Sequence, residues 1–439
     1  MKFFHIVFLF SVSCTSSYSQ QNKLVAGPMQ GHITATTAKV WLFTKKVNVV
    51  NVILTDKISK TSKTVIVHTD TIKPVNKQYP MTVEFKDLQP DTDYELSLQF
   101  DNIPIEKKSN LKTLKQAAVA DFSFLTGSCA MQLSWVLKPF TRMGSDNIFE
   151  YMLKVPADFM IWLGDNSYYI KRTFAEDDFA SAKGMWKKQI KTRKMKRMNN
   201  FMVAYPQYAI WDDHDFGSYD ADGSFPLKDT SLSIYKSIWA NPSYGLPETK
   251  GIFTSFRKYD AEFILLDDRF YRTEPFAKNG TMLGKAQLNW LFSKLKQSDA
   301  TFKFIILGSQ FINPCSTSEC YNQFPDEKKE IYNFLEDNNI KGVIFITGDS
   351  HYADLQKEER KNTYPLYDFT CSPLTSFLDK PTELEKANTS RVLNTLTPHR
   401  NFGKVSVNGP AGKRVCTIEL YDDSAKLLWK HDIPEEELR

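Results

Sequence analysis

Ala209-Ile-Trp-Asp-Asp-His-Asp-Phe-Gly217 is the stretch from which the fold and the function of this chain are predicted. A short apolar run ends there in four consecutive polar residues: Asp212, Asp213, His214 and Asp215. Like charges a few ångströms apart raise one another's pKa values, so a cation or a hydrogen-bond network must neutralise such a cluster. The stretch is therefore a candidate metal site at the tip of a strand.

Three further apolar runs end in residues that bind metal or transfer protons. They are Asp158-Phe-Met-Ile-Trp-Leu-Gly-Asp165, Gly342-Val-Ile-Phe-Ile-Thr-Gly-Asp-Ser-His351 and Phe122-Ser-Phe-Leu-Thr-Gly-Ser-Cys129. Short, continuous apolar runs that contain Gly at their ends indicate strands buried on both faces of a sheet. Ligands of such sheets bind outside the carboxyl ends of the strands. We therefore expect the four strand tips to converge on one site.

The ordered set of motifs resembles that of the PhoD-like alkaline phosphatases, over about residues 24 to 430. The motifs are Gly127-Ser-Cys129, Gly164-Asp-Asn-Ser-Tyr168, Trp211-Asp-Asp-His-Asp215, Leu266-Asp-Asp-Arg269, Leu307-Gly-Ser-Gln310 and Gly348-Asp-Ser-His351, followed by Tyr364-Pro-Leu-Tyr-Asp-Phe-Thr-Cys-Ser-Pro-Leu-Thr375. The resemblance implies an α/β fold with a four-layer calcineurin-like metallophosphatase core. It also implies a centre of Fe3+ and Ca2+ that hydrolyses phosphoric esters.

The residue types suit such a centre. Asp165 is the carboxylate expected to bridge two metals, which together supply a metal-activated hydroxide and clamp the phosphate. Cys129 and Tyr168 offer a thiolate and a phenolate, which suit ferric iron, whereas oxygen ligands suit calcium. Zn2+ or Mn2+ are alternatives. The candidates that complete the two ligand shells are Asp212, Asp213, Asp349 and His351.

Several of these side chains have a second interpretation. Tyr168 could pack as a core aromatic residue, and Cys129 as a small buried apolar one. His214 is a catalytic candidate that hydrogen-bonds the phosphate or protonates the leaving oxygen, or it orients a neighbouring aspartate. Arg269 is a second catalytic candidate that contacts the substrate phosphate in bidentate fashion, or it forms a structural salt bridge to Asp267 or another local carboxylate. Gln310 contacts substrate or caps a strand end.

The chain departs from the family pattern after the Asp-Asp-His motif. Many relatives carry an asparagine there, where this sequence reads Phe216-Gly-Ser-Tyr-Asp220. Either Asp220 or Asp222 replaces the amide ligand, or the second metal is held differently.

Composition indicates an ordinary globular protein. At 439 residues the chain is longer than a single hydrophobic core usually organises, so two domains are expected. Its 42% hydrophobic and 24% charged residues fit this class, and the net charge of +5 gives no reason to expect nucleic-acid binding. The expected partner is a small-molecule or lipid phosphoric ester, and we expect a monomer. No run after the N-terminus approaches the ~20 residues that span a bilayer.

The N-terminus resembles a Sec-type signal peptide. A cationic start and an apolar core precede small residues, so residues 1–19 are predicted to be removed after Ser19. The mature protein would be periplasmic or extracellular. Cys14 raises the alternative of a lipid anchor, although Ser11 fits a lipoprotein signal poorly. The signal lacks the twin-arginine pair often seen in this family.

Removal of this segment leaves five cysteines, an odd number that predicts at least one free thiol in an oxidising compartment. Cys129 is the expected free thiol. Cys315 and Cys320 are close enough for a local disulfide. Cys371 and Cys416 are either a second pair or buried free thiols.

Residues 20–115 are predicted to form a fibronectin III/Ig-like β-sandwich. The strands Val40–Thr44, Val50–Leu54, Thr64–His68 and Met81–Phe85 are short, β-branched and separated by turn residues. Leu88-Gln-Pro-Asp-Thr-Asp-Tyr94 resembles a tyrosine corner. A linker at Lys112–Gln116 leads into the catalytic domain, residues 116–439.

The catalytic domain alternates strands with helices, which indicates α/β layering. Helices are expected over Phe149–Lys154, Phe179–Met198, Lys285–Lys296 and Glu327–Asn338, and a hairpin over Arg414–His431. Lys187–Arg197 carries seven basic residues, which form a solvated helix face or a field that steers anionic substrates.

Three functions fit the sequence. The first is a secreted alkaline phosphatase or phosphodiesterase. The second is a phospholipase-type phosphodiesterase that uses the same centre with a different pocket width. The third is a non-catalytic surface binding protein, which the intact motif set disfavours.

Overall fold

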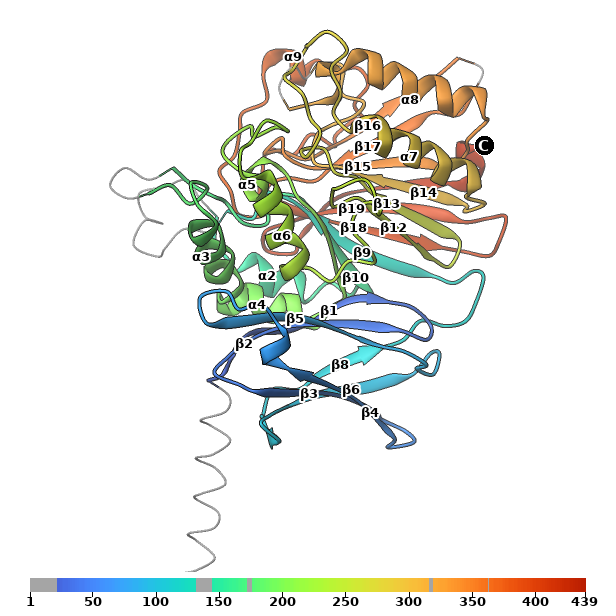
Figure 1. Cartoon of the computed structure of the whole chain (residues 1–439). Coiled ribbons are helices and arrows are strands. Elements are labelled where there is room, and N and C mark those ends of the chain that lie inside the picture. Colours follow the sequence, from blue (N-terminus) through green and yellow to red (C-terminus); the bar gives the residue numbers. More distant parts are fainter. Residues whose placement is uncertain (1–21, 132–143, 172–175, 316–318, 362) are drawn as a thin grey trace, which may run out of the picture. The chain divides into compact units, whose positions relative to one another are not determined.

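The computed structural model describes residues 22–131, 144–171, 176–315, 319–361 and 363–439 (Figure 1). The predicted signal peptide lies outside the described residues. The chain divides into two compact units. The first contains the chain up to Gln116, Arg193–Gln207 and Ser237–Ala240, and the second contains the rest. No helix of the described segments is long and apolar enough to cross a membrane.

The first unit is a β-sandwich of two antiparallel sheets. One sheet has the order β1 (Leu24–Ile33), β2 (Ala38–Lys45), β5 (Gln78–Phe85). The other has the order β4 (Ser62–His68), β3 (Val49–Asp56), β6 (Asp93–Phe100), β7 (Ile103–Pro104), with β8 (Ser109–Lys112) also paired to β6. The predicted sandwich is confirmed, and the four predicted strands lie within β2, β3, β4 and β5.

The sequence patterns did not reveal β1, because Gly27, Pro28 and Gly31 interrupt its apolar residues. Its register against β2 shifts three times, so the strand is bulged where these residues fall. Strand β6 has the clean alternation of a half-buried strand, with Tyr94, Leu96, Leu98 and Phe100 in the core.

The predicted tyrosine corner is confirmed. The Tyr94 side chain is buried, and its hydroxyl oxygen accepts a hydrogen bond of 2.9 Å from the backbone N–H of Gln89. This bond ties the loop before β6 to the buried Tyr94 and so fixes the crossover that leads into the strand.

The basic run at Lys187–Arg197 does not form one solvated face. It is divided between α3 (Ala182–Arg193) and α4 (Lys196–Ala204). Arg193 is buried, with its guanidinium 4.9 Å from the ring centre of Trp239, and Lys188 is only 6% exposed. The prediction of a solvated face is therefore wrong for these two residues. A pattern of charges in the sequence does not show which of the long basic side chains are covered by other parts of the structure.

The second unit contains two six-stranded mixed sheets. One has the order β11 (Gln207–Ile210), β10 (Phe159–Leu163), β9 (Phe122–Gly127), β18 (Asn401–Asn408), β19 (Val415–Asp422), β20 (Leu427–Pro434). The other has the order β12 (Thr254–Lys258), β13 (Ala261–Leu265), β14 (Phe302–Ile306), β15 (Val343–Thr347), β17 (Leu366–Thr370), β16 (Asp354–Glu358). The apolar runs form parallel strands: β9 pairs with β10, and β15 pairs with β14 and β17.

Aromatic side chains fill the space between the two sheets. The ring centre of Phe124 on β9 lies 5.4 Å from that of Phe263 on β13 and 5.6 Å from that of Phe304 on β14, both edge to face. Phe159 on β10 meets Phe263 at 5.5 Å. The high aromatic content of the sequence thus supplies an interdigitated core, because edge-to-face pairs pack large rings densely.

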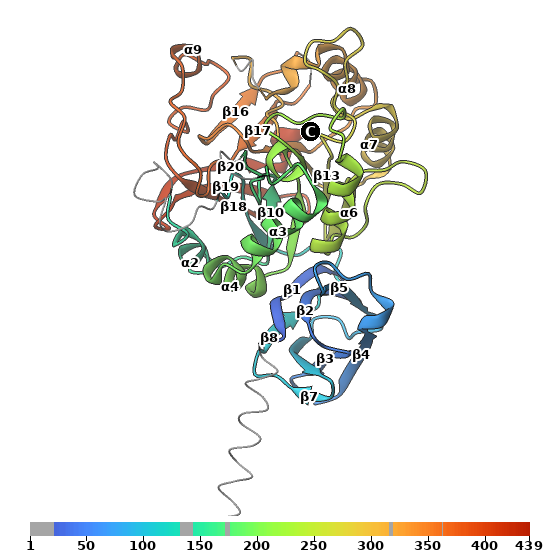
Figure 2. The same cartoon turned by 60° about the vertical axis from the view of Figure 1, so that its left-hand side comes forward.

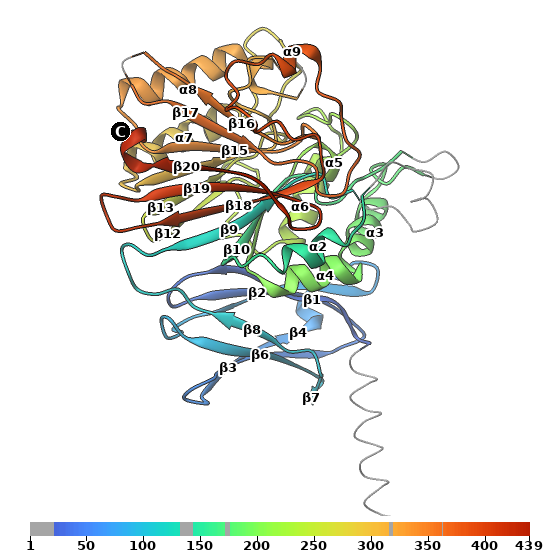
Figure 3. The same cartoon turned by 180° about the vertical axis from the view of Figure 1, so that it is seen from behind.

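Helices cover the outer faces of the sheets. Figures 1 and 2 show α7 (Lys285–Gln297) and α8 (Pro325–Asp337) side by side, and a stacked pair, Phe292 and Phe334, joins them with ring centres 4.0 Å apart. Figure 3 shows α2 (Ile148–Met152) beside β9 and β10, away from α7 and α8. Tyr235 of α6 (Lys228–Ile238) packs on Trp211, the residue after β11, with ring centres 5.2 Å apart. The structure therefore has the predicted helix, sheet, sheet, helix layering.

Three of the predicted helices coincide with α2, α7 and α8 within a few residues, and the predicted hairpin is β19–β20. The predicted helix Phe179–Met198 is instead two helices, α3 and α4. The sequence patterns did not predict helix α6, because Thr230, Ser231 and Ser233 have modest helix propensity and interrupt the pattern of apolar residues. Two short helices complete the unit, α5 (Asp213–Phe216) and α9 (Glu383–Lys386).

None of the five cysteines of the described residues forms a disulfide, so neither suggested disulfide is present. Cys371 lies against Thr126, which pairs with Gly403, whereas Cys416 pairs with Val407. Positions 403 and 407 are four residues apart along β18, or about 13 Å at ~3.3 Å per residue. This spacing exceeds the reach of a disulfide.

Removal of the Tyr94 hydroxyl tests the tyrosine corner. We expect Tyr94→Phe to lower the free energy of unfolding of the sandwich by about 0.5–1.5 kcal/mol, the net value of one hydrogen bond, because the N–H of Gln89 loses its acceptor in the protein. Urea denaturation of the full chain measures the effect. Tyr79→Phe is the matched control, since the Tyr79 hydroxyl has no hydrogen-bond partner reported within the described ranges. An equal loss in both variants would show that the hydroxyl of Tyr94 has no special role.

Candidate metal centre

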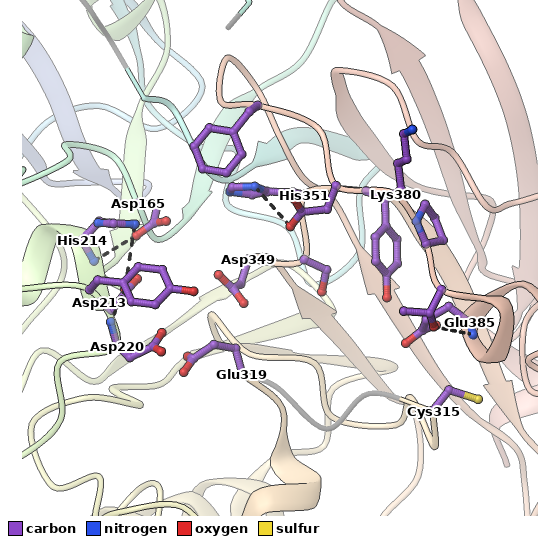
Figure 4. A pocket seen from close by; sticks show the side chains of 17 residues that line it. Asp165, Asp213, His214, Asp220, Cys315, Glu319, Asp349, His351, Lys380 and Glu385 are labelled. Atoms are coloured by element: carbon purple, nitrogen blue, oxygen red, sulfur yellow. Dashed lines mark hydrogen bonds and ion pairs between the residues drawn. The ribbon is translucent and has the colours of Figure 1, made fainter. Parts of the chain in front are cut away.

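The four strand tips converge as the sequence predicts. Metal-binding atoms lie within 4.8 Å of one another in three overlapping groups: Cys129, Asp165 and Asp349; Asp165, Asp213 and His214; Asp212, Asp213 and Asp349. Figure 4 shows Asp165, Asp213 and His214 gathered at one end of a cavity, with Asp349 and His351 beside them. Asp165, Asp213 and Asp349 each belong to two of these groups, which is the arrangement expected of a carboxylate shared by two cations, and Asp165 is the one that the sequence predicts as the bridge.

The backbone at these tips turns sharply. Cys129, Asp165 and Asp349 have φ values of 56°, 56° and 63°, in the left-handed region that non-glycine residues rarely adopt. Gly164 has φ 94°, and a Cβ atom there would lie 2.6 Å from Cβ of Asp212. Only glycine therefore lets the β10 tip approach the β11 tip, and the strained residues occur where function is expected.

Cys129 is held by the segment that follows β17. The Ser372 hydroxyl donates to Sγ of Cys129 at 3.2 Å, and Sγ lies 3.7 Å from Oδ2 of Asp165. The backbone oxygen of Cys129 accepts from the N–H groups of Thr375 and Ser376. The motif at Tyr364–Thr375 thus positions the thiol at the site.

Tyr168 reaches the same place from the loop after β10. Its side chain is buried, and among the described residues its hydroxyl has no hydrogen-bond partner. Its ring stacks on His214 with centres 4.1 Å apart. Burial, together with the charges of Asp165 and Cys129, raises the pKa of the phenol. A buried phenol without a partner beside two candidate ligands fits metal coordination better than core packing.

The carboxylates of the cluster destabilise one another's charged form. Desolvation and the charges of Asp213, Asp215 and Asp349 raise the pKa of Asp165 well above its usual range. Oδ2 of Asp212 is buried and without a hydrogen-bond partner within the described segments. A bound cation would keep these groups ionised and satisfy the free oxygen, so the donor set fits a metal centre.

Arg269 is enclosed behind the cluster. Its guanidinium is fully buried, and Nε lies 2.5 Å from Oδ1 of Asp212, while the other end pairs with Glu319. It does not line the cavity. The geometry supports the salt-bridge interpretation, with Asp212 and Glu319 as the partners in place of Asp267, whose carboxylate already accepts from Trp211 and from the backbone.

The two histidines occupy different surroundings. The backbone N–H of His214 donates to Oδ1 of Asp165 at 3.2 Å, and its imidazole lines the cavity. Desolvation lowers the pKa of this imidazole, which is therefore neutral at neutral pH. Nδ1 of His351 lies 3.6 Å from Oδ2 of Asp379. His351 lines the cavity but belongs to none of the three ligand groups of the described residues.

Asp220 and Asp222 are the two residues that could replace the asparagine ligand of the relatives, and the structure distinguishes between them. Asp220 lines the cavity, and its N–H donates to Oδ2 of Asp213 at 2.7 Å. Desolvation and the neighbouring charges of Glu319 and Asp213 raise the pKa of Asp220 to about 6. Asp222 instead caps a turn by accepting from N and Oγ of Ser224. Asp220 is therefore the better candidate ligand.

Glu319 is a site residue that the sequence reading missed. It lines the cavity and pairs with both Arg269 and Arg272. No strand-tip motif contains it, so only its position in space reveals it. Gln310, by contrast, donates to Oγ1 of Thr370 at 2.8 Å and lies outside the cavity, as expected of a strand-end cap.

The cavity above the cluster has a volume of about 510 Å³. From the carboxylate end it extends past His351 to Lys380, Glu385 and Cys315 (Figure 4). It is thus larger than a phosphoryl group requires, and falls in the range of about 300–1,000 Å³ that encloses whole small ligands.

The fold and the motifs match known phosphatases. Residues 241–416 match the family model described as PhoD-like phosphatase, and residues 21–116 match a domain of unknown function, DUF7800. The structure entitled "Structure of PhoD" superposes with a TM-score of 0.74 and 17% identity, over 92% of this chain and 91% of that one. The purple acid phosphatase PPD1 from yellow lupin gives a TM-score of 0.66 and 12% identity, over 93% and 74%. The fold is thus that of these two phosphatase structures.

Alkaline phosphatase D of Bacillus subtilis (strain 168) is 23% identical over 338 residues, which are 65% of this chain. The match spans 55% of that relative's length. The resemblance stated from the sequence is confirmed: residues 241–416 match the PhoD-like phosphatase model, alkaline phosphatase D is a relative at 23% identity, and the structure of PhoD shares the fold.

The role of Arg269 can be tested through stability. We expect Arg269→Met to lower the free energy of unfolding of the second unit by about 3–5 kcal/mol, because it leaves Asp212 and Glu319 buried without their cation. Arg257→Met is the control, since its ion pair with Asp299 is exposed and its loss should cost under about 1 kcal/mol. Denaturant unfolding compares the two. A stable Arg269→Met protein with a raised KM would instead identify a substrate contact.

Proposed function

We propose that the protein is a secreted, metal-dependent phosphoric ester hydrolase. The observation that carries the proposal is the pair of ligand groups that share Asp165 at one end of a cavity open to small molecules. The family match supports the reaction class. The binding-protein alternative has no support from the site, because each strand tip retains its ligand-type side chain.

Cys129, Asp165, Tyr168 and Asp349 would hold one cation, for which the thiol and the phenol favour Fe3+. Asp165 and Asp213 would hold the second together with Asp220, which takes the place of His214 in that ligand group because carboxylate oxygens suit Ca2+ better than an imidazole nitrogen. When bound, the cations provide Lewis acidity that activates water and stabilises charge on the phosphoryl oxygens. Zn2+ or Mn2+ would supply the same chemistry.

The remaining residues bind and orient. His214 presents a neutral imidazole to the cavity, where its N–H can donate to a phosphoryl oxygen or to the leaving oxygen. Stacking on Tyr168 and the backbone bond to Asp165 fix its position. Arg269 holds Asp212 and Glu319 from behind, so its contribution is to position carboxylates and not to contact substrate.

Two substitutions distinguish a ligand from a residue that only contacts substrate. Asp165→Asn should lose metal and activity together, because an amide is a poor bridge between cations. His214→Ala should keep metal while turnover falls by ~100-fold to ~10,000-fold, the range for a lost acid or base. Metal content by elemental analysis and turnover of an aryl phosphate measure both effects.

Asp222→Asn is the matched control, since Asp222 belongs to the same loop as the candidate ligand Asp220 but caps a turn outside the cavity. It should keep both metal and activity. Loss of all metal in His214→Ala would make the histidine a ligand. Full activity of the wild type after complete chelation would contradict the metal mechanism.

The identity of one metal can be read from colour. If a thiolate and a phenolate bind ferric iron, the purified protein should show a visible charge-transfer band that Tyr168→Phe or Cys129→Ser removes or shifts. Tyr169→Phe is the control, because this neighbouring tyrosine is equally buried and lies outside the cavity lining. A colourless, active protein that contains zinc or manganese would reject iron.

A further inference from the structure

Two exposed aromatic rings line the cavity beside its charged groups. Tyr219 is 73% exposed and Phe377 is 44% exposed, and both belong to the cavity wall. They come from different parts of the chain, the loop after α5 and the segment after β17. Large rings are costly to leave in water, so their placement on the wall of a ligand cavity calls for a function.

Each ring packs on one of the two site histidines. The ring centre of Tyr219 lies 5.7 Å from that of His214, and Phe377 meets His351 edge to face at 4.7 Å. The imidazole-bearing residues are far less exposed than the aromatic ones, with His351 at 8%. The aromatic rings therefore stand nearer the mouth of the cavity, where the organic group of a bound ester would lie.

The segment that carries Phe377 is firmly held. Ser376 donates its N–H to the backbone oxygen of Cys129 and accepts from Nε of Arg400, while Asp379 pairs with His351. The ring is thus presented by backbone tied to the metal cluster itself. A preorganised wall of this kind binds without a large ordering cost.

We propose that Tyr219 and Phe377 form a binding site for the organic group of the substrate and favour esters in which that group is a planar aromatic ring. The inference depends on the proposed hydrolase function. The carboxylate end of the cavity would take the phosphoryl group, and the two rings would stack on, or meet edge to face, the ring of the ester. The carboxylates at that end offer no such surface.

Benzyl phosphate and cyclohexylmethyl phosphate test the proposal, since they share an alkoxide leaving group and a ring size and differ in planarity. The metal-loaded full chain should favour benzyl phosphate in kcat/KM by about 10-fold. Tyr219→Leu and Phe377→Leu should each reduce this ratio by about 3-fold to 10-fold, mainly through KM. Phe276→Leu is the control, because Phe276 is 64% exposed but lies outside the cavity.

Calorimetric binding of benzylphosphonate and cyclohexylmethylphosphonate gives a readout that needs no turnover. Equal affinities in the wild type, or a benzyl preference that survives in the Tyr219→Leu, Phe377→Leu double variant, would overturn the aromatic site. A benzyl preference in binding that the variants lose, in a protein that hydrolyses neither ester, would overturn the hydrolase function and leave the aromatic site in place.

Discussion

The buried carboxylates around Asp165 repel one another, and the rest of the second unit holds them together against this repulsion. Asp165, Asp212, Asp349 and the Cys129 thiol lie in overlapping groups a few ångströms across, and desolvation disfavours the charged form of each of these four side chains. In water such groups would separate. Here the strands that carry these side chains are fixed by hydrogen bonds within the sheets, so the side chains cannot move apart. Binding of cations is then the way in which their mutual repulsion is relieved.

The surrounding structure maintains this arrangement in two ways. Backbone in the left-handed region turns Cys129, Asp165 and Asp349 back toward one another at the strand tips. Arg269 neutralises part of the charge from the buried side, where it pairs with Asp212 and Glu319. A buried arginine with two carboxylates also limits how far those carboxylates can move.

Rigidity of the site depends in turn on the aromatic core between the sheets. Phe124 and Phe159 belong to the same strands that end in Cys129 and Asp165, and both pack on Phe263 of the opposite sheet. Each strand is thus fixed at its middle by ring packing and presents its ligand at its end. The cavity wall is built differently, from loops that carry Tyr219 and Phe377, and loops are where relatives of one fold diverge in substrate.

The sequence by itself determined the strand tips, the sandwich and the tyrosine corner. These features follow from local patterns: apolar runs that end in Gly-Asp or Gly-Ser-Cys, β-branched alternation, and a tyrosine at a fixed spacing from its acceptor loop. The tertiary structure alone decided the partners of Arg269, the presence of Glu319 in the site, the choice of Asp220 over Asp222, the burial of Lys188 and the separation of Cys371 from Cys416. Each of these depends on distances between segments far apart in the chain. Periodicity and spacing depend on a residue's neighbours in the sequence. Ion pairing, burial and the distance between two cysteines depend on its neighbours in space.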